Sequence, residues 1–228
     1  MPNSLSLRIV VPDPTEVGSS VQVRPIVDGR DILDEVFSEG PGAQPEELLT
    51  PQGPLSADVE PHEARLATAI CAESCCGAIY VTVYRDGDQV VWGSWRNPDD
   101  ASVDLPEFRF DADEYRHQLD QARLNTTWEW PARTVARLLE EKLRDAPELL
   151  AHWSCELHAV AAWPWRRDEV VVLLFHPGRP TTYPDRPWQQ LQLVFPVLQD
   201  DLADQVDRLF AQLTVVDPRP KASVCGGG

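Results

Sequence analysis

Two short runs of alternating side chains, joined by an Asp-Gly pair, constrain the fold of this chain more than any other feature. The runs extend from Gly77 to Trp92, and Asp86-Gly87 separates them. Alternation with a period of two places neighbouring side chains on opposite faces of a strand. Asp-Gly favours the positive φ angles of a tight turn. The pattern therefore predicts an antiparallel hairpin with one face buried in a core.

Similar patterns predict the other elements. Asp28-Gly29 predicts a second hairpin turn. Further strands are expected at 5–11, 21–27, 105–110, 156–163, 170–175 and 190–195. Helices are expected to start at acidic caps or first-turn prolines, namely Asp111, Pro131 and Asp200 or Asp201. Strands that precede helices mixed with more strands indicate an α+β fold, with antiparallel hairpins and a mixed sheet packed against at least three helices.

The length of 228 residues permits one large domain or two small ones. We expect a single α+β domain over 1–216. Within it, residues 39–61 are rich in Gly, Pro and acidic side chains, which is typical of a long surface loop, with a short helix at Pro45 to Leu49. Residues 217–228 show no periodicity and are expected to form a flexible tail.

The charge balance narrows the classes of partner. The chain has 37 Asp and Glu against 20 Lys and Arg, a net charge of -17. A chain with this net charge has a negative electrostatic field, which repels phosphate backbones and anionic lipid headgroups. We therefore expect no binding to nucleic acid or to membranes. A field of this sign attracts basic protein surfaces, cationic small molecules and metal ions.

Two further features bear on the cellular compartment. Residues 1–12 lack the basic start and unbroken apolar core of a signal peptide, and no segment approaches the ~20 apolar residues of a membrane span. The five cysteines are an odd number in a chain long enough to bury a core, so a disulfide scaffold is not required. Together they predict a cytoplasmic protein.

Three thiols stand directly before the predicted hairpin. Cys71, Cys75 and Cys76 fall within six residues. Thiolates are soft ligands that favour tetrahedral zinc, and a fourth ligand could come from Cys155 or His158, which two residues separate. One alternative is a redox or disulfide role for these thiols. Another is that these small apolar side chains pack beneath the hairpin. Zinc is the cofactor that this cluster predicts.

Four tryptophans are candidates for contact with a partner protein. Trp92 and Trp95 follow the hairpin turn, and Trp163 and Trp165 flank a proline in an expected loop. Exposed aromatic rings make strong anchors in protein interfaces. The alternative is that these rings fill a core that is poor in Met and Phe.

The last residues of the sequence suggest a third role. Gly227 and Gly228 end a stretch that resembles the Gly-Gly tail of ubiquitin-like modifiers and sulfur carriers. That resemblance implies a terminal carboxylate that an activating enzyme would adenylate. The alternative is a disordered end without a function.

The stretch from Cys75 to Val83, together with Trp92 and Arg96-Asn97-Pro98, resembles a segment of uncharacterised actinobacterial proteins. The resemblance covers about a tenth of the chain. It implies a bacterial cytoplasmic origin and no catalytic residue.

No glycine-rich phosphate loop, nucleophile elbow, kinase signature or EF-hand loop is present, and no catalytic residue is assigned. The leading hypothesis is a non-catalytic, acidic protein that binds another protein with a basic surface, as an immunity or antitoxin-like factor would. One alternative is a zinc-binding protein that uses the three clustered thiols. Another is a modifier that is conjugated through its Gly-Gly end.

Overall fold

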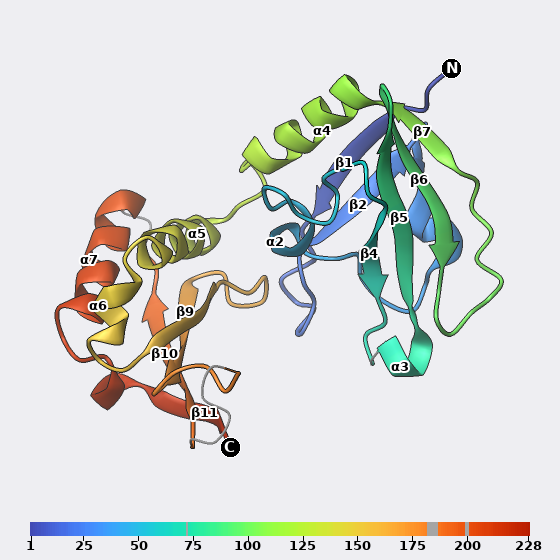
Figure 1. Cartoon of the computed structure of the whole chain (residues 1–228). Helices are drawn as coiled ribbons and strands as arrows, with labels where there is room; N and C mark the ends of the chain where they lie inside the picture. The colour runs from blue at the N-terminus through green and yellow to red at the C-terminus, as the bar shows by residue number, and fades with distance from the viewer. Residues whose placement is uncertain (72, 182–186, 199–200) are drawn as a thin grey trace. The chain divides into compact units, whose positions relative to one another are not determined.

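The computed structural model describes residues 1–71, 73–181, 187–198 and 201–228 (Figure 1). The backbone groups into two compact units, whereas the sequence patterns indicate a single domain. The first unit comprises Met1–Pro12 and Ser19–Trp128, and the second comprises Asp13–Gly18 and Glu129–Gly228. Among the described residues, the first unit has two sheets and the second has one, and each unit has its own buried side chains, so each is described separately.

A four-stranded antiparallel sheet dominates the first unit. In the order β4-β5-β6-β7, its strands are His62–Thr68, Ala78–Asp86, Gln89–Arg96 and Phe108–Asp111. Asp86 pairs with Gln89, and Gly87 in the turn between them has a φ of +61°. This pairing confirms the hairpin predicted from the alternating runs. A two-residue turn of this kind requires a left-handed backbone, which Gly87 provides.

A second sheet of the first unit has the order β1-β2-β3, with strands Leu5–Val10, Gln22–Val27 and Arg30–Asp31. Asp28 and Gly29 both have positive φ angles, 50° and 80°, as the Asp-Gly pair predicts. Pro25 lies in the middle strand and has no backbone N–H. No hydrogen bond to β3 is lost at this position, because β3 pairs only with Ile26 and Val27.

The helices of the first unit are α1 (Ile32–Val36), α2 (Pro45–Leu48), α3 (Glu73–Cys76) and α4 (Ala112–Leu124). Asp111 caps α4 as expected, since its Oδ1 accepts hydrogen bonds of 3.0 Å from the backbone N atoms of the next turn. The short helices α1 and α3 are not predicted by the sequence, because four or five residues are too few to show a helical stripe.

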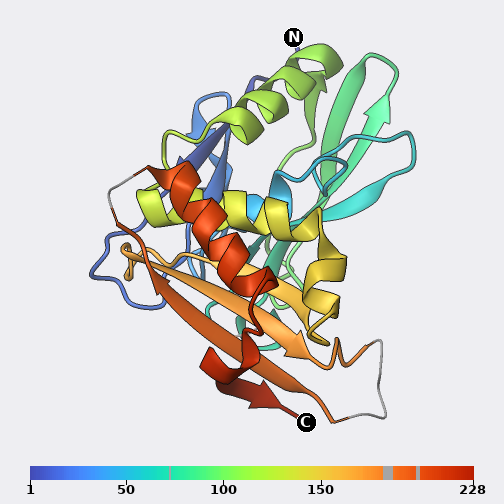
Figure 2. The same cartoon turned by 90° about the vertical axis from the view of Figure 1, so that its left-hand side faces the viewer.

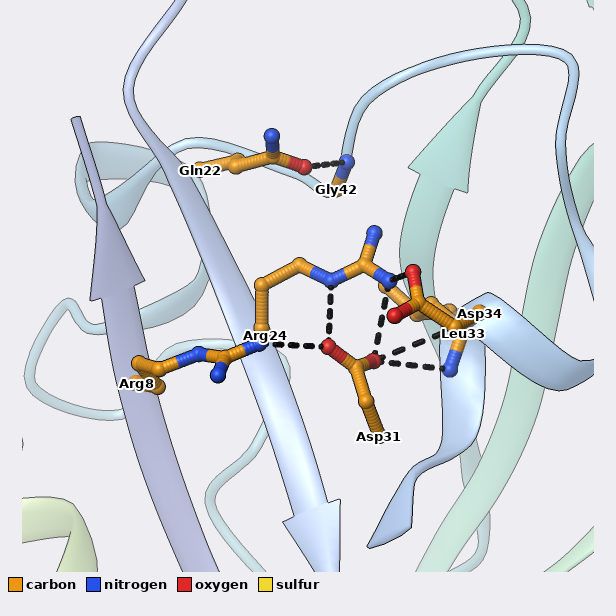
Figure 3. A network of polar contacts seen from close by, with 7 residues as sticks. All are labelled: Arg8, Gln22, Arg24, Asp31, Leu33, Asp34 and Gly42. Atoms are coloured by element: carbon orange, nitrogen blue, oxygen red, sulfur yellow. Dashed lines mark hydrogen bonds and ion pairs between the residues drawn. The ribbon is translucent and has the colours of Figure 1, made fainter. Parts of the chain in front are cut away.

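A buried ion pair joins β2 to α1 (Figure 3). The guanidinium of Arg24, a residue only 8% exposed, donates from Nε to Asp31 Oδ2 at 2.9 Å and lies 2.9 Å from Asp31 Oδ1 through Nη2. The same Nη2 contacts Asp34, and Arg8 contacts Asp31 from β1. Asp31 also caps α1 by accepting from the backbone N of Leu33 at 3.2 Å. One carboxylate therefore holds two strands and a helix together.

Aromatic rings fill the core of the first unit. Trp92 is fully buried, and its ring centroid lies 5.6 Å from that of Phe110 and 6.1 Å from that of Tyr115. Trp92 Nε1 donates to the Tyr115 hydroxyl at 3.1 Å, which in turn donates to the carbonyl of Leu55 at 2.7 Å. Leu55 and Leu48 are buried too, so the segment predicted to be a surface loop contributes side chains to the core.

The second unit contains the sheet β11-β10-β9-β8, with strands Ser223–Gly227, Gln189–Pro196, Glu169–His176 and Glu156–Ala161. Figure 2 shows α5 (Pro131–Arg144) and α7 (Leu202–Thr214) lying across one face of this sheet. β9 is an inner strand whose valines are buried, as the run of apolar residues at 170–175 predicts. The remaining helices of the unit are α6 (Pro147–Ala151) and the short 3-10 helix η1 (Arg219–Lys221).

The predicted helix starts at Pro131 and Asp201 are confirmed, and Asp200 lies outside the described residues. All strand pairs within the three sheets of the described chain are antiparallel, and the α+β class is confirmed. None of the described helices has both the length and the apolar character that crossing a bilayer requires.

Candidate metal centre

The three clustered thiols lie in the connection between two paired strands. β4 ends at Thr68 and β5 begins at Ala78, and these two residues face each other in the sheet. The backbone N of Ala69 donates to the carbonyl of Gly77 at 3.1 Å and closes the connection. Figure 1 shows α3 at the end of the sheet where β4 passes into β5. We call residues 69–77 the thiol loop.

Gly77 ends α3 and turns the chain into β5. Its backbone N donates to the carbonyl of Glu73 at 2.9 Å, and its φ of +82° is the left-handed conformation that ends many helices. A Cβ at this position would lie 1.9 Å from Oδ1 of Asn97. That oxygen accepts from the backbone N of Ala78 at 3.3 Å and of Asp99 at 3.1 Å. The close approach of Asn97 thus requires glycine.

Replacing Gly77 with alanine should therefore destabilise the first unit more than replacing Gly87 does. Alanine costs about 1–2 kcal/mol in a left-handed conformation at either position. At Gly77 it also displaces Asn97, whose two hydrogen bonds contribute about 1 kcal/mol each. Urea denaturation measures both losses. Gly87→Ala is the matched control, because nothing lies within 4 Å of its Cβ. Equal losses in the two variants would contradict the assigned role of Asn97.

The three sulfur atoms are spaced as ligands of one ion. Cys71 Sγ lies 3.0 Å from Cys76 Sγ, Cys76 Sγ lies 3.5 Å from Cys75 Sγ, and all three lie within 4.8 Å of one another. A Zn–S bond of about 2.3 Å places the sulfur atoms of a tetrahedral site about 3.8 Å apart. Shifts of less than about 1 Å would thus convert the observed cluster into a coordination sphere. Cys71 and Cys75 are exposed, so an ion from solvent can reach them.

Hydrogen bonds within the cluster hold a proton on its central thiol. The pKa of Cys76 is raised to about 12, first by its hydrogen bond with Cys71, then by that with Cys75 and by burial. Metal ions bind thiolates and not thiols, so an arriving ion must displace these protons. Binding at this cluster is therefore coupled to proton release.

Polar side chains beside the thiols anchor α3 to the sheet. The Tyr80 hydroxyl donates to Glu73 Oε1 at 2.8 Å, and Arg65 lies 3.9 Å from the other oxygen of that carboxylate. Arg96 covers the Tyr80 ring, with its guanidinium carbon 4.0 Å from the ring centroid. The sequence patterns do not single out Glu73 or Tyr80 as site residues. The features that could have indicated them are an acidic residue between the cysteines and a tyrosine on the polar face of the hairpin.

The charge of the surroundings favours a cation. The first unit has 21 Asp and Glu against 9 Arg, so -12 of the net charge of -17 belongs to it. Three thiolates would make this unit more negative still. A bound cation offsets that repulsion, whereas an anion would add to it.

Cys155 and His158 belong to the second unit, and neither is part of the three-thiol group. Cys155 is buried, its Sγ donates to the carbonyl of Trp153 at 3.6 Å, and burial raises its pKa to about 11. The His158 ring lies 4.8 Å from the Phe175 ring. The structure thus gives the predicted fourth ligands ordinary packing roles in their own unit.

The four candidate tryptophans divide into two groups. Trp92 lies in the core, where a partner surface does not reach it, and the partly buried Trp95 donates from Nε1 to the carbonyl of Pro106 at 2.9 Å. Trp163 and Trp165 stack at 5.7 Å with an interplanar angle of 5° and remain partly exposed. Trp95, Trp163 and Trp165 are thus all partly exposed, and only Trp92 is excluded by burial as a contact for a partner.

The Gly-Gly end is a paired strand in the structure. Gly227 belongs to β11 and faces Gln189, and Gly228 exchanges two backbone hydrogen bonds with Trp188, at 3.0 and 3.1 Å. The stretch predicted to be a flexible tail therefore contains regular structure. Adenylation of the terminal carboxylate would require these bonds to open first.

A hollow of about 610 Å³ lies within the second unit, between the ends of α5 and α6 and the start of β8. Apolar side chains line it together with Arg144, Arg179, Glu156, Ser154 and Cys155. Glutamates engage both arginines, Glu140 at Arg144 and Glu156 at Arg179. The charges of the hollow are thus balanced internally, and its walls favour no particular class of ligand.

No protein-family model, curated protein or solved structure matches the chain. Within the described residues, Cys71, Cys75 and Cys76 form the only group of three or more metal-ligating side chains. A function is therefore inferred from the positions of the three thiols in the thiol loop.

Proposed function

We propose that this protein binds a thiophilic metal ion, zinc in the first place, through Cys71, Cys75 and Cys76. The observation that carries the proposal is the convergence of three Sγ atoms within 4.8 Å on one closed loop. Exposure of two of the thiols and the negative charge of the first unit support it. Soft sulfur ligands select ions such as zinc over magnesium or calcium.

Three protein ligands leave one position of a tetrahedral ion open for water or for a group on a partner. Glu73 is the nearest carboxylate in the chain sequence, but Tyr80 and Arg65 engage it. Its role is therefore to position α3, so that Cys75 and Cys76 face Cys71. A site of this kind would exchange its ion more readily than a closed site with four cysteines.

Titration of the reduced, metal-free chain with Co²⁺ tests the proposal, because cobalt bound by thiolates absorbs strongly where the aqueous ion does not. We expect one ion per chain. Serine at any of the three cysteines should lower the affinity by more than the ~100-fold that a lost supporting residue costs. Zinc added afterwards should displace the cobalt.

The matched controls are Cys155→Ser and Cys225→Ser, which remove thiols outside the thiol loop and should leave the titration unchanged. Circular dichroism checks that each variant folds. Absence of a thiolate band in the native chain would overturn the proposal. So would a band that persists when all three loop cysteines are serine.

Binding of a partner protein with a basic surface stays a second prediction, in addition to metal binding. The observation that favours it is the concentration of negative charge in the first unit. The stacked Trp163 and Trp165 offer partly exposed aromatic area in the second unit. Association that weakens steeply with salt would be its signature.

A further inference from the structure

We propose that the thiol loop is also a peroxide-sensitive switch, in which oxidation joins Cys71 and Cys76 in a disulfide. The two Sγ atoms are 3.0 Å apart, and a disulfide bond of about 2.05 Å requires them to approach by only about 1 Å more. The consequence for metal binding rests on the proposed function. The oxidation itself does not depend on it.

The geometry favours this pair of thiols over the other close pair. Cys75 and Cys76 are adjacent in the chain, so their Cα atoms are about 3.8 Å apart across a trans peptide. Disulfides usually need Cα atoms about 4.4–6.8 Å apart, which adjacent residues cannot provide without strain. Cys76 Sγ also lies closer to Cys71 Sγ, at 3.0 Å, than to Cys75 Sγ, at 3.5 Å.

The oxidant is hydrogen peroxide, and Cys71 is the thiol that meets it, because Cys71 is exposed whereas Cys76 is half-buried. The Cys71 thiolate attacks one peroxide oxygen, so that an S–O bond forms and the O–O bond breaks. The released hydroxide takes a proton and becomes water. Cys71 is then a sulfenic acid.

Cys76 completes the reaction. Its sulfur attacks the sulfenic sulfur of Cys71, the S–S bond forms, and the S–O bond breaks. The departing oxygen takes the Cys76 proton and leaves as a second water. Two thiols have then lost two electrons, and one peroxide has gained them.

Oxidation would remove two of the three metal ligands at once. A disulfide sulfur carries no negative charge and binds zinc weakly, so Cys75 alone would remain as a thiolate. The ion would leave, and a dithiol reductant would restore the site. The thiol loop would thus hold its ion only in a reducing environment.

Mass spectrometry of the whole chain tests the oxidation. The reduced, metal-free protein is treated with stoichiometric hydrogen peroxide, its remaining thiols are alkylated, and it is digested with trypsin. Cleavage after Arg65 and Arg85 releases all three loop cysteines in one peptide. We expect this peptide to carry a single alkyl group and to have lost two hydrogens. After reduction and a second alkylation it should carry three alkyl groups.

Serine variants identify the pair. Cys75→Ser should form the disulfide as the native chain does, with no alkylated cysteine left in the peptide. Cys71→Ser and Cys76→Ser should form none. Cys225→Ser removes the other exposed thiol and serves as the matched control for disulfides between chains. A disulfide that persists in Cys71→Ser, or oxidation of the native loop only to sulfinic acid, would overturn the inference.

Cobalt binding separates this inference from the proposed function. A chain that forms the Cys71–Cys76 disulfide but never binds Co²⁺ when reduced overturns the metal proposal and supports the oxidation. A chain that binds Co²⁺ but forms no disulfide overturns the oxidation alone. When both hold, peroxide should abolish the cobalt–thiolate band and dithiothreitol should restore it.

Discussion

Replacing Asp31 with alanine is expected to lower the free energy of unfolding of the first unit by about 3–5 kcal/mol, the usual cost of removing one partner from a buried ion pair. Arg24 is only 8% exposed, and Asp31 binds its guanidinium through both carboxylate oxygens. The substitution would leave that charge buried with Asp34 as its remaining partner and would also remove the cap of α1. Urea denaturation followed by tryptophan fluorescence and circular dichroism measures the loss.

The control for this prediction is Glu35→Ala, which breaks the ion pair of Glu35 with Arg30 in the same region. Arg30 is largely exposed, and exposed pairs contribute about 0–1 kcal/mol. A variant in which Arg24 and Asp31 are both replaced by apolar residues should lose less than Asp31→Ala, because no charge is then left buried. Similar losses for Asp31→Ala and Glu35→Ala would show that burial of Arg24 does not determine stability here.

The affinity of the thiol loop for metal is expected to rise steeply with pH. In the metal-free chain, hydrogen bonds with Cys71 and Cys75 raise the pKa of Cys76 to about 12, so this thiol is protonated at neutral pH. Each proton that the ion displaces makes the affinity about tenfold higher per pH unit. Release of three protons would therefore give about a 1000-fold rise per unit, and binding would be lost as the pH falls.

Competition between the protein and a chelator of known affinity, repeated from about pH 6 to pH 8, gives the number of protons released per ion. The Cys76→Ser variant is the control, since it lacks the thiol that is protonated in the metal-free chain, and its slope should be smaller by one. An affinity that does not change with pH would mean that the ion is not bound by these thiols.

The elements that could be predicted from sequence are those that depend on near neighbours. Asp28-Gly29 and Asp86-Gly87 each place a residue with positive φ directly after a run of strand-forming side chains. Asp111 lies directly before the helix that it caps. In each case the residues that make the contacts are within a few positions of one another, so their spacing alone carries the information.

The features that could not be predicted depend on residues far apart in the chain. No spacing rule links Tyr115 to Leu55, yet this hydrogen bond ties a loop that looks polar in sequence to the aromatic core. The division into two units leaves no mark in the order of elements, because both helices and strands occur before and after Trp128.

The candidate site shows the same contrast. Cys71, Cys75 and Cys76 are close in sequence and converge in the structure. Two residues separate Cys155 from His158, but both are far from the cluster in sequence. Their spacing does not tell to which part of the fold they belong, and the structure assigns them to the other unit.

The closeness of the three thiols in sequence also determines how much a bound ion can stabilise the fold. Three ligands within six residues remain neighbours when the chain is unfolded, so the denatured protein retains part of their affinity. An ion that binds both states raises the melting temperature less than one that binds the native state alone. Metal bound by the thiol loop would thus stabilise the fold by less than its affinity for the native chain alone implies.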